Sequence, residues 1–267
     1  MRARARGPSA SPPGGHDHGR RDGTRDPAGA PEGAAGRQRH ERDDDPAKLH
    51  ADQPRRDGPA ALADLLPGFF PADELRALIE AARVAPRAGG WLVELGSYCG
   101  RSTVRLGSVA RERGLRLLAV DHHRGSIEMR PPFPWADPRL LDGDLGSPDS
   151  LGTLRDALAL ADLERHVTLW VGDGRGLIDL VRPVAGFVLV DGGHDARSCH
   201  LDLELARRFL VPGGLLAVHD VFEDPADGGQ APWRMLTAAL HLGFDLVERT
   251  GSLAIARRAT RPRRGPR

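Results

Sequence analysis

The hydrophobic positions of the chain follow two different spacings from Pro59 onward. Short continuous apolar runs are typical of strands buried on both faces of a sheet. Such runs occupy residues 91–96, 115–121, 166–172, 186–191 and 214–220. Between these runs, apolar residues recur three and four positions apart, which predicts amphipathic helices. The expected helices cover residues 71–86, 101–114, 148–164, 174–182, 196–210 and 231–243.

The end of the chain adds two more predicted strands. Residues 244–249 and 252–257 are expected to be strands joined by a short turn at Thr250-Gly251. Strands that alternate with helices form a largely parallel sheet covered on both faces. We therefore predict an α/β fold of the Rossmann-like, doubly wound kind. Its sheet would be seven-stranded and mostly parallel, with one antiparallel strand near the C-terminus. Ligands of such sheets bind at the carboxyl ends of the strands.

The first 58 residues differ in composition from the rest. Gly, Pro, Arg, Asp and His dominate them, and large apolar residues are scarce. Such a segment cannot bury enough surface to offset its ordering entropy, so residues 1–58 are predicted to be a disordered tail. There are two alternatives for this segment. It could be a non-native extension, or a docking or metal-binding arm with His16 and His18. Residues 259–267 form a second, basic tail. The folded domain is expected to span residues 59–258.

Composition narrows the classes of function. The 267-residue chain has a formal net charge of +1, so no overall field attracts it to nucleic acid or membrane. Its basic residues are scattered among acids, without an aromatic stacking platform for nucleic acid. The sequence contains neither an apolar run of membrane-spanning length nor an apolar segment typical of a signal peptide. Two cysteines, Cys99 and Cys199, are expected to be free thiols in a cytoplasmic protein.

The segment after the first strand carries the strongest candidate binding residues. Gly96 and Gly100 allow the backbone to turn tightly and to approach a ligand closely. Glu94 lies near the end of the strand, whereas Ser97 and Ser102 offer hydroxyls at the start of the next helix. Free N–H groups at a helix start suit a carboxylate or another anion. A plain strand-to-helix turn is the alternative, but the position after the first strand favours a binding loop.

Acidic residues follow the next two strands. Asp121 ends the second strand, where an acid can accept hydrogen bonds from ribose hydroxyls or simply cap a turn. The preceding loop reads G-x-x-x-G and lacks the G-x-G-x-x-G spacing that grips a pyrophosphate. Asp173 follows the third strand, where it can meet the exocyclic amine of an adenine or cap the next helix. The sequence leaves both roles of Asp173 open.

Four polar residues follow the last two parallel strands. Asp191, His194, His219 and Asp220 should converge at one rim of the sheet. Carboxylates and imidazoles together can hold a divalent cation, and a histidine can act as a general base. A hydrogen-bonded polar rim without a metal is the third alternative.

Two irregular stretches are expected to border the ligand. Residues 122–146 are rich in proline, include Phe133 and Trp135, and directly follow the candidate ribose-binding acid. A long irregular insert in a compact domain is usually functional or disordered. We interpret this stretch as a lid or substrate loop, with residues 222–233 as the opposite wall.

At these residues the sequence resembles class I S-adenosylmethionine (SAM)-dependent methyltransferases. More narrowly, the segments GSYCGRST, AVDHHRGS, VDGGH and HDVF-DPADGG resemble an actinobacterial group of small-molecule methyltransferases. The resemblance covers residues 60–257. It implies SAM contacts that include ribose contact by Asp121 and adenine contact near Asp173. The other expected cofactor-binding residues are Glu94, Gly96, Ser97, Tyr98, Gly100, Ser102 and His122.

The resemblance leaves a metal cofactor open. Some relatives hold Mg²⁺ with acids at the ends of strands four and five, and Asp191 and Asp220 match those positions. His219 stands where the strictly metal-dependent relatives carry an acid. Mg²⁺ at Asp191 and Asp220 is therefore an optional second cofactor beside SAM.

The expected reaction is in-line transfer of the SAM methyl group to an oxygen or nitrogen of a small-molecule acceptor. His219 or His194 would take the acceptor proton, or Asp191 and Asp220 would hold a cation that lowers the pKa of a hydroxyl. The two rival functions are a non-catalytic SAM- or nucleotide-binding protein and a NAD-dependent oxidoreductase. No nucleic-acid or membrane partner is expected, and a homo-oligomer is left open.

Overall fold

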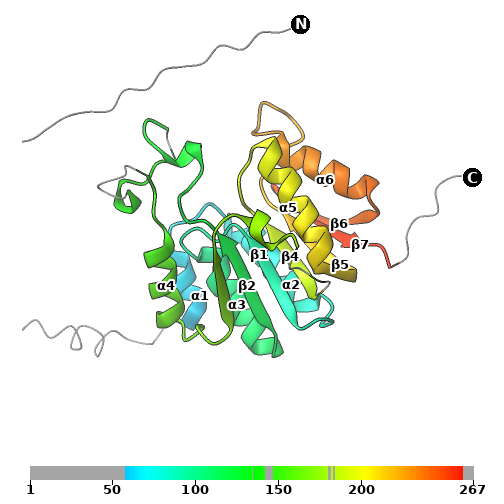
Figure 1. The fold of residues 1–267 in the computed structure, drawn as a ribbon, viewed down its shortest axis with the longest axis horizontal. Coiled ribbons are helices and arrows are strands. Elements are labelled where there is room, and N and C mark those ends of the chain that lie inside the picture. Colours follow the sequence, from blue (N-terminus) through cyan, green and yellow to red (C-terminus); the bar gives the residue numbers. More distant parts are fainter. Residues whose placement is uncertain (1–57, 134, 142–146, 180–181, 183, 261–267) are drawn as a thin grey trace, which may run out of the picture. The chain divides into compact units, whose positions relative to one another are not determined.

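The computed structural model describes residues 58–133, 135–141, 147–179, 182 and 184–260. At its centre is a seven-stranded sheet with the strand order β3-β2-β1-β4-β5-β7-β6 (Figure 1). The pairs from β3 to β5 are all parallel, whereas β7 runs antiparallel to both of its neighbours. The predicted fold class is confirmed, including the single antiparallel strand near the C-terminus.

The strands lie close to their predicted positions. They are β1 (Trp91–Leu95), β2 (Arg116–Asp121), β3 (Val167–Val171), β4 (Ala185–Val190), β5 (Leu210–Val218), β6 (Phe244–Thr250) and β7 (Leu253–Arg258). Strand β5 starts four residues earlier than predicted, because Leu210 already pairs with Ala185 before the register shifts. Pro and Gly residues at 212–214 concealed this early start from the apolar pattern.

The helices show two differences from the prediction. They are α1 (Gly58–Leu65), α2 (Ala72–Val84), α3 (Arg101–Arg113), α4 (Leu151–Leu160), α5 (Ala196–Phe209) and α6 (Ala231–His241). Helix α1 was not predicted. Within the described residues, the segment predicted as a helix at 174–182 forms only the 3₁₀ helix Gly174–Leu177, since Gly174 and Gly176 disfavour a longer helix. None of the helices in the described ranges is long and apolar enough to cross a bilayer.

The two predicted tails lie almost wholly outside the described residues. Of residues 1–58, only Gly58 is described, and it begins α1. Of residues 259–267, only Ala259 and Thr260 are described.

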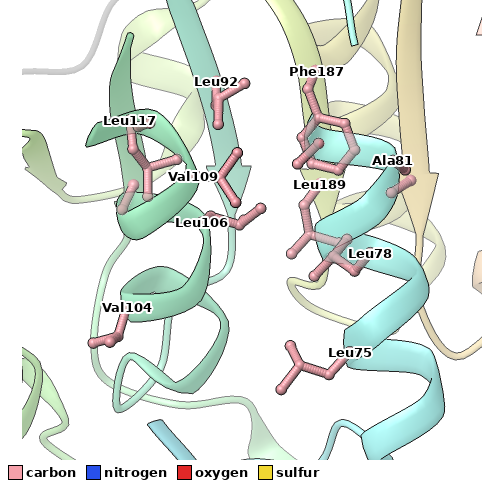
Figure 2. Close-up of a cluster of buried hydrophobic side chains, with 14 of the residues drawn as sticks. Leu75, Leu78, Ala81, Leu92, Val104, Leu106, Val109, Leu117, Phe187 and Leu189 are labelled. Atoms are coloured by element: carbon pink, nitrogen blue, oxygen red, sulfur yellow. The ribbon is translucent and has the colours of Figure 1, made fainter. Parts of the chain in front are cut away.

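The core forms one layer on each face of the sheet. Leu92 and Phe187 join the cluster beneath α2 and α3, whereas their chain neighbours Val93 and Val188 join the cluster beneath α5 and α6. This division follows from the alternation of side chains along a strand. Figure 2 shows the first cluster, where side chains of α2 and α3 converge with those of β1 and β4. Because helices cover both faces of the sheet, a ligand is expected to bind at the carboxyl ends of the strands.

Candidate active site

The loop between β1 and α3 makes a tight turn beside the end of β4. Gly96 has a φ of 92°, and a Cβ at this position would overlap the carbonyl group of Asp191. Gly100 has a φ of 95°, and its Cβ would lie 2.6 Å from Leu154 Cδ1. Both positions therefore require glycine. The close approach at Gly96 brings this glycine loop, residues 96–100, directly against the end of β4.

Asp121 organises the glycine loop through backbone hydrogen bonds. Its Oδ2 accepts from the N–H groups of Ser97 at 2.9 Å and Tyr98 at 2.8 Å. Its Oδ1 accepts from the N–H of His123 at 2.7 Å. Each carboxylate oxygen can accept two hydrogen bonds, so Oδ1 keeps one acceptor position for a ligand hydroxyl. Asp121 thus holds the loop and can still contact a ribose.

Glu94 is fully buried behind the same loop. Its Oε2 accepts a hydrogen bond from Thr103 Oγ1 at 2.7 Å. Burial raises the pKa of Glu94 to about 8, against the opposing effect of the Ser102 and Thr103 hydroxyls. Glu94 Oε1 and Ser97 Oγ are two of the six buried side-chain atoms of the described residues that have no hydrogen-bond partner. Buried polar atoms are almost always paired. These two atoms, with the glycine turn, therefore fit a polar ligand bound against this loop.

The residues predicted for the adenine side lie at the ends of β2 and β3. Asp173 accepts hydrogen bonds from the N–H of Arg175 at 2.8 Å and from its guanidinium, which lowers the pKa of Asp173. Asp173 therefore caps the 3₁₀ helix, one of the two roles that the sequence allowed. His122 is exposed, and its Nδ1 accepts from the N–H of Arg124 at 3.0 Å. Contact of Asp173 and His122 with a cofactor stays a prediction.

The four rim residues come together at the ends of β4 and β5. His219 Nδ1 lies 3.0 Å from Asp191 Oδ1 and 3.5 Å from Asp220 Oδ2. His194 Nε2 lies 3.1 Å from Asp220 Oδ2, and its Nδ1 lies 3.9 Å from Glu128 Oε2. Two imidazoles and two aspartates thus form one charged cluster.

The two histidines of this cluster differ in their availability. His219 is buried, and its second ring nitrogen lies 2.8 Å from Glu74 Oε2. The side chain of His194 is one-third exposed, at 33%. The carboxylate of Asp220 raises the pKa of His194, although partial burial opposes it. Because both nitrogens of His219 already face carboxylates, His194 is the more accessible of the two candidate bases.

Glu74 is the functional residue that the sequence analysis did not identify. It is 4% exposed, and besides His219 it accepts a hydrogen bond from the N–H of Ser252 at 2.7 Å. It lies in the first turn of α2, where the helix dipole alone can account for an acid. Its helical spacing from Leu78 and Ala81 places it on the apolar face of the helix, where an unpaired acid is rare. An acidic residue on the apolar face of a predicted helix was therefore the sequence signal that could have identified Glu74.

An aromatic cavity of about 330 Å³ lies beside the glycine loop. The ring of Phe69 stacks on Tyr98, with centroids 5.7 Å apart, and meets Trp135 edge-on at 5.5 Å. Asp137 and Arg139, which form an ion pair at 2.6 Å, also line it. The part of stretch 122–146 that contains Trp135 therefore borders the cavity.

Neighbouring side chains connect this cavity with the charged cluster. Phe70 follows Phe69 in the chain, and its ring stacks on His219 with centroids 3.9 Å apart. The short segment before α2 thus contributes one ring to the cavity and the next ring to the cluster.

The cluster fits Mg²⁺ poorly. Atoms of Asp191, His219 and Asp220 lie within 4.8 Å of one another, a spacing that a metal ion could bridge. However, Mg²⁺ prefers six oxygen ligands, and the central group here is an imidazole. Nδ1 of that imidazole lies 3.0 Å from Asp191 Oδ1, within hydrogen-bond distance.

Comparisons with known proteins agree with this architecture. Residues 93–221, from β1 to just beyond β5, match a family model described as a methyltransferase domain. The matched range contains the glycine loop, Asp121 and the rim residues Asp191 and Asp220.

Solved structures with low identity share the fold. The cofactor-bound protein Rv0187 from MTB is 19% identical, with a TM-score of 0.52 over 80% of this chain and 90% of that chain. A protein from Corynebacterium glutamicum is 12% identical, with a TM-score of 0.53 over 79% and 94% of the two chains. A Staphylococcus aureus protein, provisionally named a caffeoyl-CoA O-methyltransferase, is 13% identical, with a TM-score of 0.50 over 74% and 88%.

The family match, the sheet order and the geometry of the glycine loop agree on one class of protein. They favour a methyltransferase over the rival oxidoreductase and over a binding protein without catalysis. The chain is an enzyme, a SAM-dependent methyltransferase.

Proposed function

We propose that this enzyme transfers the methyl group of SAM to an oxygen, or alternatively a nitrogen, of a small-molecule acceptor. The observation that carries the proposal is the close approach of Gly96 to Asp191. It places the cofactor-binding loop next to a cluster of carboxylates and imidazoles. A group that activates a hydroxyl is therefore available beside the methyl donor. The narrower resemblance to actinobacterial small-molecule methyltransferases stays a prediction.

The cofactor would lie along the carboxyl ends of β1 and β2. Gly96 and Gly100 let the backbone approach it, and the unpaired atoms Glu94 Oε1 and Ser97 Oγ supply acceptors or donors. Asp121 Oδ1 offers its remaining acceptor position to a ribose hydroxyl. The remaining predicted contacts are Tyr98, Ser102, His122 and Asp173. Bound SAM supplies a methyl group that its sulfonium already activates, so the protein mainly has to orient the acceptor.

The acceptor would occupy the aromatic cavity. A volume of about 330 Å³ is at the small end of the range for ligand pockets, which suits a compact acceptor. Phe69 and Trp135 can cover an apolar or planar face, whereas Arg139 can meet an anionic substituent.

His194 is the base that the geometry favours for an acceptor hydroxyl. Its imidazole is partly exposed, and its Nε2 lies 3.1 Å from Asp220 Oδ2. Asp191, also at this rim, adds negative charge that stabilises the imidazolium formed on proton uptake. His219 was the other candidate base, but its two nitrogens are occupied by Asp191 and Glu74.

The proposal is tested with the full-length chain and isotope-labelled SAM. Purified protein is incubated with panels of phenols, catechols, sugar hydroxyls and amines, and labelled products are identified by mass spectrometry. We expect methylation of an oxygen or nitrogen that falls at least tenfold in His194→Gln, while S-adenosylhomocysteine (SAH) still binds with native affinity. Labelling confined to carbon, or to added RNA, would contradict the proposal.

A further inference from the structure

The aromatic cavity has one charged wall. Among the described residues that line the cavity, only Asp137 and Arg139 are charged. The two side chains differ in exposure, since 78% of the Arg139 side chain is exposed, against 17% of that of Asp137. The carboxylate is therefore largely covered, whereas the guanidinium is open to a ligand. A ligand in the cavity thus meets positive charge at this wall, although the ion pair as a whole is neutral.

The ion pair occupies only one edge of the guanidinium. Asp137 Oδ1 accepts from Nε of Arg139 at 2.9 Å, and Oδ2 accepts from Nη2 at 2.6 Å. Oδ1 also accepts from the backbone N–H of Arg139 at 3.0 Å, which fixes the pair on the short helix Pro138–Leu140. Nη1 makes no hydrogen bond with any other described residue. The second edge of the guanidinium, between Nη1 and Nη2, can therefore donate to both oxygens of a carboxylate.

Three aromatic rings line the same cavity. Phe69 and Trp135 are exposed, although large aromatic side chains gain much free energy from being covered. Phe69 stacks on Tyr98, and Trp135 meets Phe69 edge-on, so the three rings form one apolar wall. A further ring can join such a wall in an offset-stacked or edge-to-face arrangement. The cavity thus offers an aromatic surface and a guanidinium edge to the same ligand.

Tyr98 connects both features with the glycine loop. It belongs to that loop, and its φ of 45° is unusual for a residue other than glycine. Burial raises the pKa of its hydroxyl, Asp137 raises this pKa further, and Arg139 opposes them, so the hydroxyl lies close to the charged pair. A ligand held by Arg139 and the rings would therefore lie beside the loop that we propose to bind the cofactor.

We propose that the acceptor is an aromatic carboxylic acid, whose carboxylate binds the second edge of Arg139 and whose ring lies against Phe69 and Trp135. The group to be methylated is a hydroxyl or amino group on that ring. Two fixed points leave the acceptor little freedom to rotate, which orients its nucleophile toward the methyl group. The inference rests on the proposed function and names its acceptor class.

The transfer itself is the one proposed above. The acceptor oxygen or nitrogen forms a bond to the methyl carbon, and the C–S bond of SAM breaks with its electron pair left on sulfur. The acceptor proton goes to His194, so SAH and the methylated acid are the products.

The first test compares two probes of nearly equal shape, benzoate and benzamide. The full-length protein is saturated with SAH, and binding of each probe is measured by NMR titration. Benzoate is expected to bind about tenfold more tightly than benzamide, because only the carboxylate forms a charge-assisted pair with Arg139. Equal affinities, or no binding of benzoate at millimolar concentration, would overturn the inference. The titration needs no turnover, so the inference and the proposed function can fail separately.

The second test removes the guanidinium from the exposed wall. Arg139→Gln is expected to abolish the preference for benzoate, while binding of benzamide and of SAH changes less than about twofold. Arg139→Lys keeps the charge but not the planar edge, so it should recover only part of the preference. Arg155→Gln, at an exposed site on α4 outside the cavity, is the matched control. An unchanged preference in Arg139→Gln would show that another group recognises the carboxylate.

The third test follows methyl transfer to three related acceptors: protocatechuic acid, its amide and catechol. We expect kcat/KM for the acid to exceed that for the two neutral acceptors by about tenfold, with the difference mainly in KM. The advantage of the acid should disappear in Arg139→Gln. Equal kcat/KM for all three acceptors would leave the proposed methyl transfer intact and contradict the inference about the acceptor class.

Discussion

The glycine loop and the charged cluster lie side by side at one edge of the sheet, yet they are built in opposite ways. The glycine loop is held by a single carboxylate. Asp121 accepts hydrogen bonds from backbone N–H groups no more than 24 residues away. In the cluster, side chains bond to side chains, and the His219–Glu74 contact joins residues 145 positions apart. The first region depends on backbone shape, whereas the second depends on charge.

This difference has consequences for how each region tolerates change. A loop held through its backbone is sensitive to any residue that cannot adopt positive φ, but it is less sensitive to side-chain identity. A cluster of buried charges is sensitive to the removal of one partner, because the remaining charges are left uncompensated. Substitutions at Gly96, where the two regions meet, and within each region should show which region depends on backbone shape and which depends on charge.

The largest effect is expected at the junction, for Gly96→Ala. The new Cβ would overlap the carbonyl of Asp191, and φ of 92° is unfavourable for alanine. We expect the free energy of unfolding to fall by about 3 kcal/mol and SAH affinity to fall about 1,000-fold. Thermal unfolding and calorimetry measure both. Gly229→Ala, at an open position without positive φ, should be neutral; an equally neutral Gly96→Ala would refute the close approach.

The next largest effect is expected for Asp121→Ala, which removes the carboxylate that holds the glycine loop. Hydrogen bonds to a charged group contribute about 1.5–3 kcal/mol each, and three backbone N–H groups would lose their acceptor. SAH affinity should fall about 100-fold in a calorimetric titration. Asp156→Ala, an exposed acid on α4, is the matched control. Native affinity in Asp121→Ala would show that the loop keeps its shape without this carboxylate.

A smaller and pH-dependent effect is expected for Glu94, a buried carboxyl group inside the region otherwise governed by backbone shape. In the folded protein, burial raises the pKa of the Glu94 carboxyl group to about 8, whereas the ordinary value is 4.5. The free energy of unfolding should therefore decrease as pH rises from 5 to 8.

Glu94→Gln should remove this part of the pH dependence, because the amide does not titrate. Denaturant unfolding of both proteins at pH 5, 6, 7 and 8 measures the difference. Parallel curves for the two proteins would show that Glu94 is already ionised at pH 5.

The smallest effect is expected for Trp135→Ala, which removes one wall of the aromatic cavity. Loss of an aromatic contact of about 1 kcal/mol should raise KM for the acceptor about fivefold and leave SAH affinity unchanged. Steady-state kinetics with an acceptor from the panel measure it. Val247→Ala, an exposed apolar residue on β6, is the control. A weakened SAH complex with unchanged acceptor KM would place the cofactor, rather than the acceptor, in this cavity.

The sequence by itself determined the order of the elements, the single antiparallel strand and the glycine loop. These features have local signals: apolar periodicity, and glycines that directly follow a strand. The same reasoning missed α1 and overestimated the helix at 174–182, where glycines and a capping Asp173 favour a short 3₁₀ helix. It also identified Asp121, because its position at the end of β2 follows from the alternation of strand and helix.

Only the tertiary structure decided what the identified side chains do. Asp191, His219 and Asp220 could be placed at one rim from the sequence, but whether they form a metal site, a base or a hydrogen-bonded cluster depends on their neighbours. The deciding neighbour, Glu74, comes from a helix early in the chain and is fixed by Ser252 near its end. The free energy of a buried charge depends on every group within a few ångströms, whatever the distance along the chain. For that reason the sequence located this site, and the fold determined its chemistry.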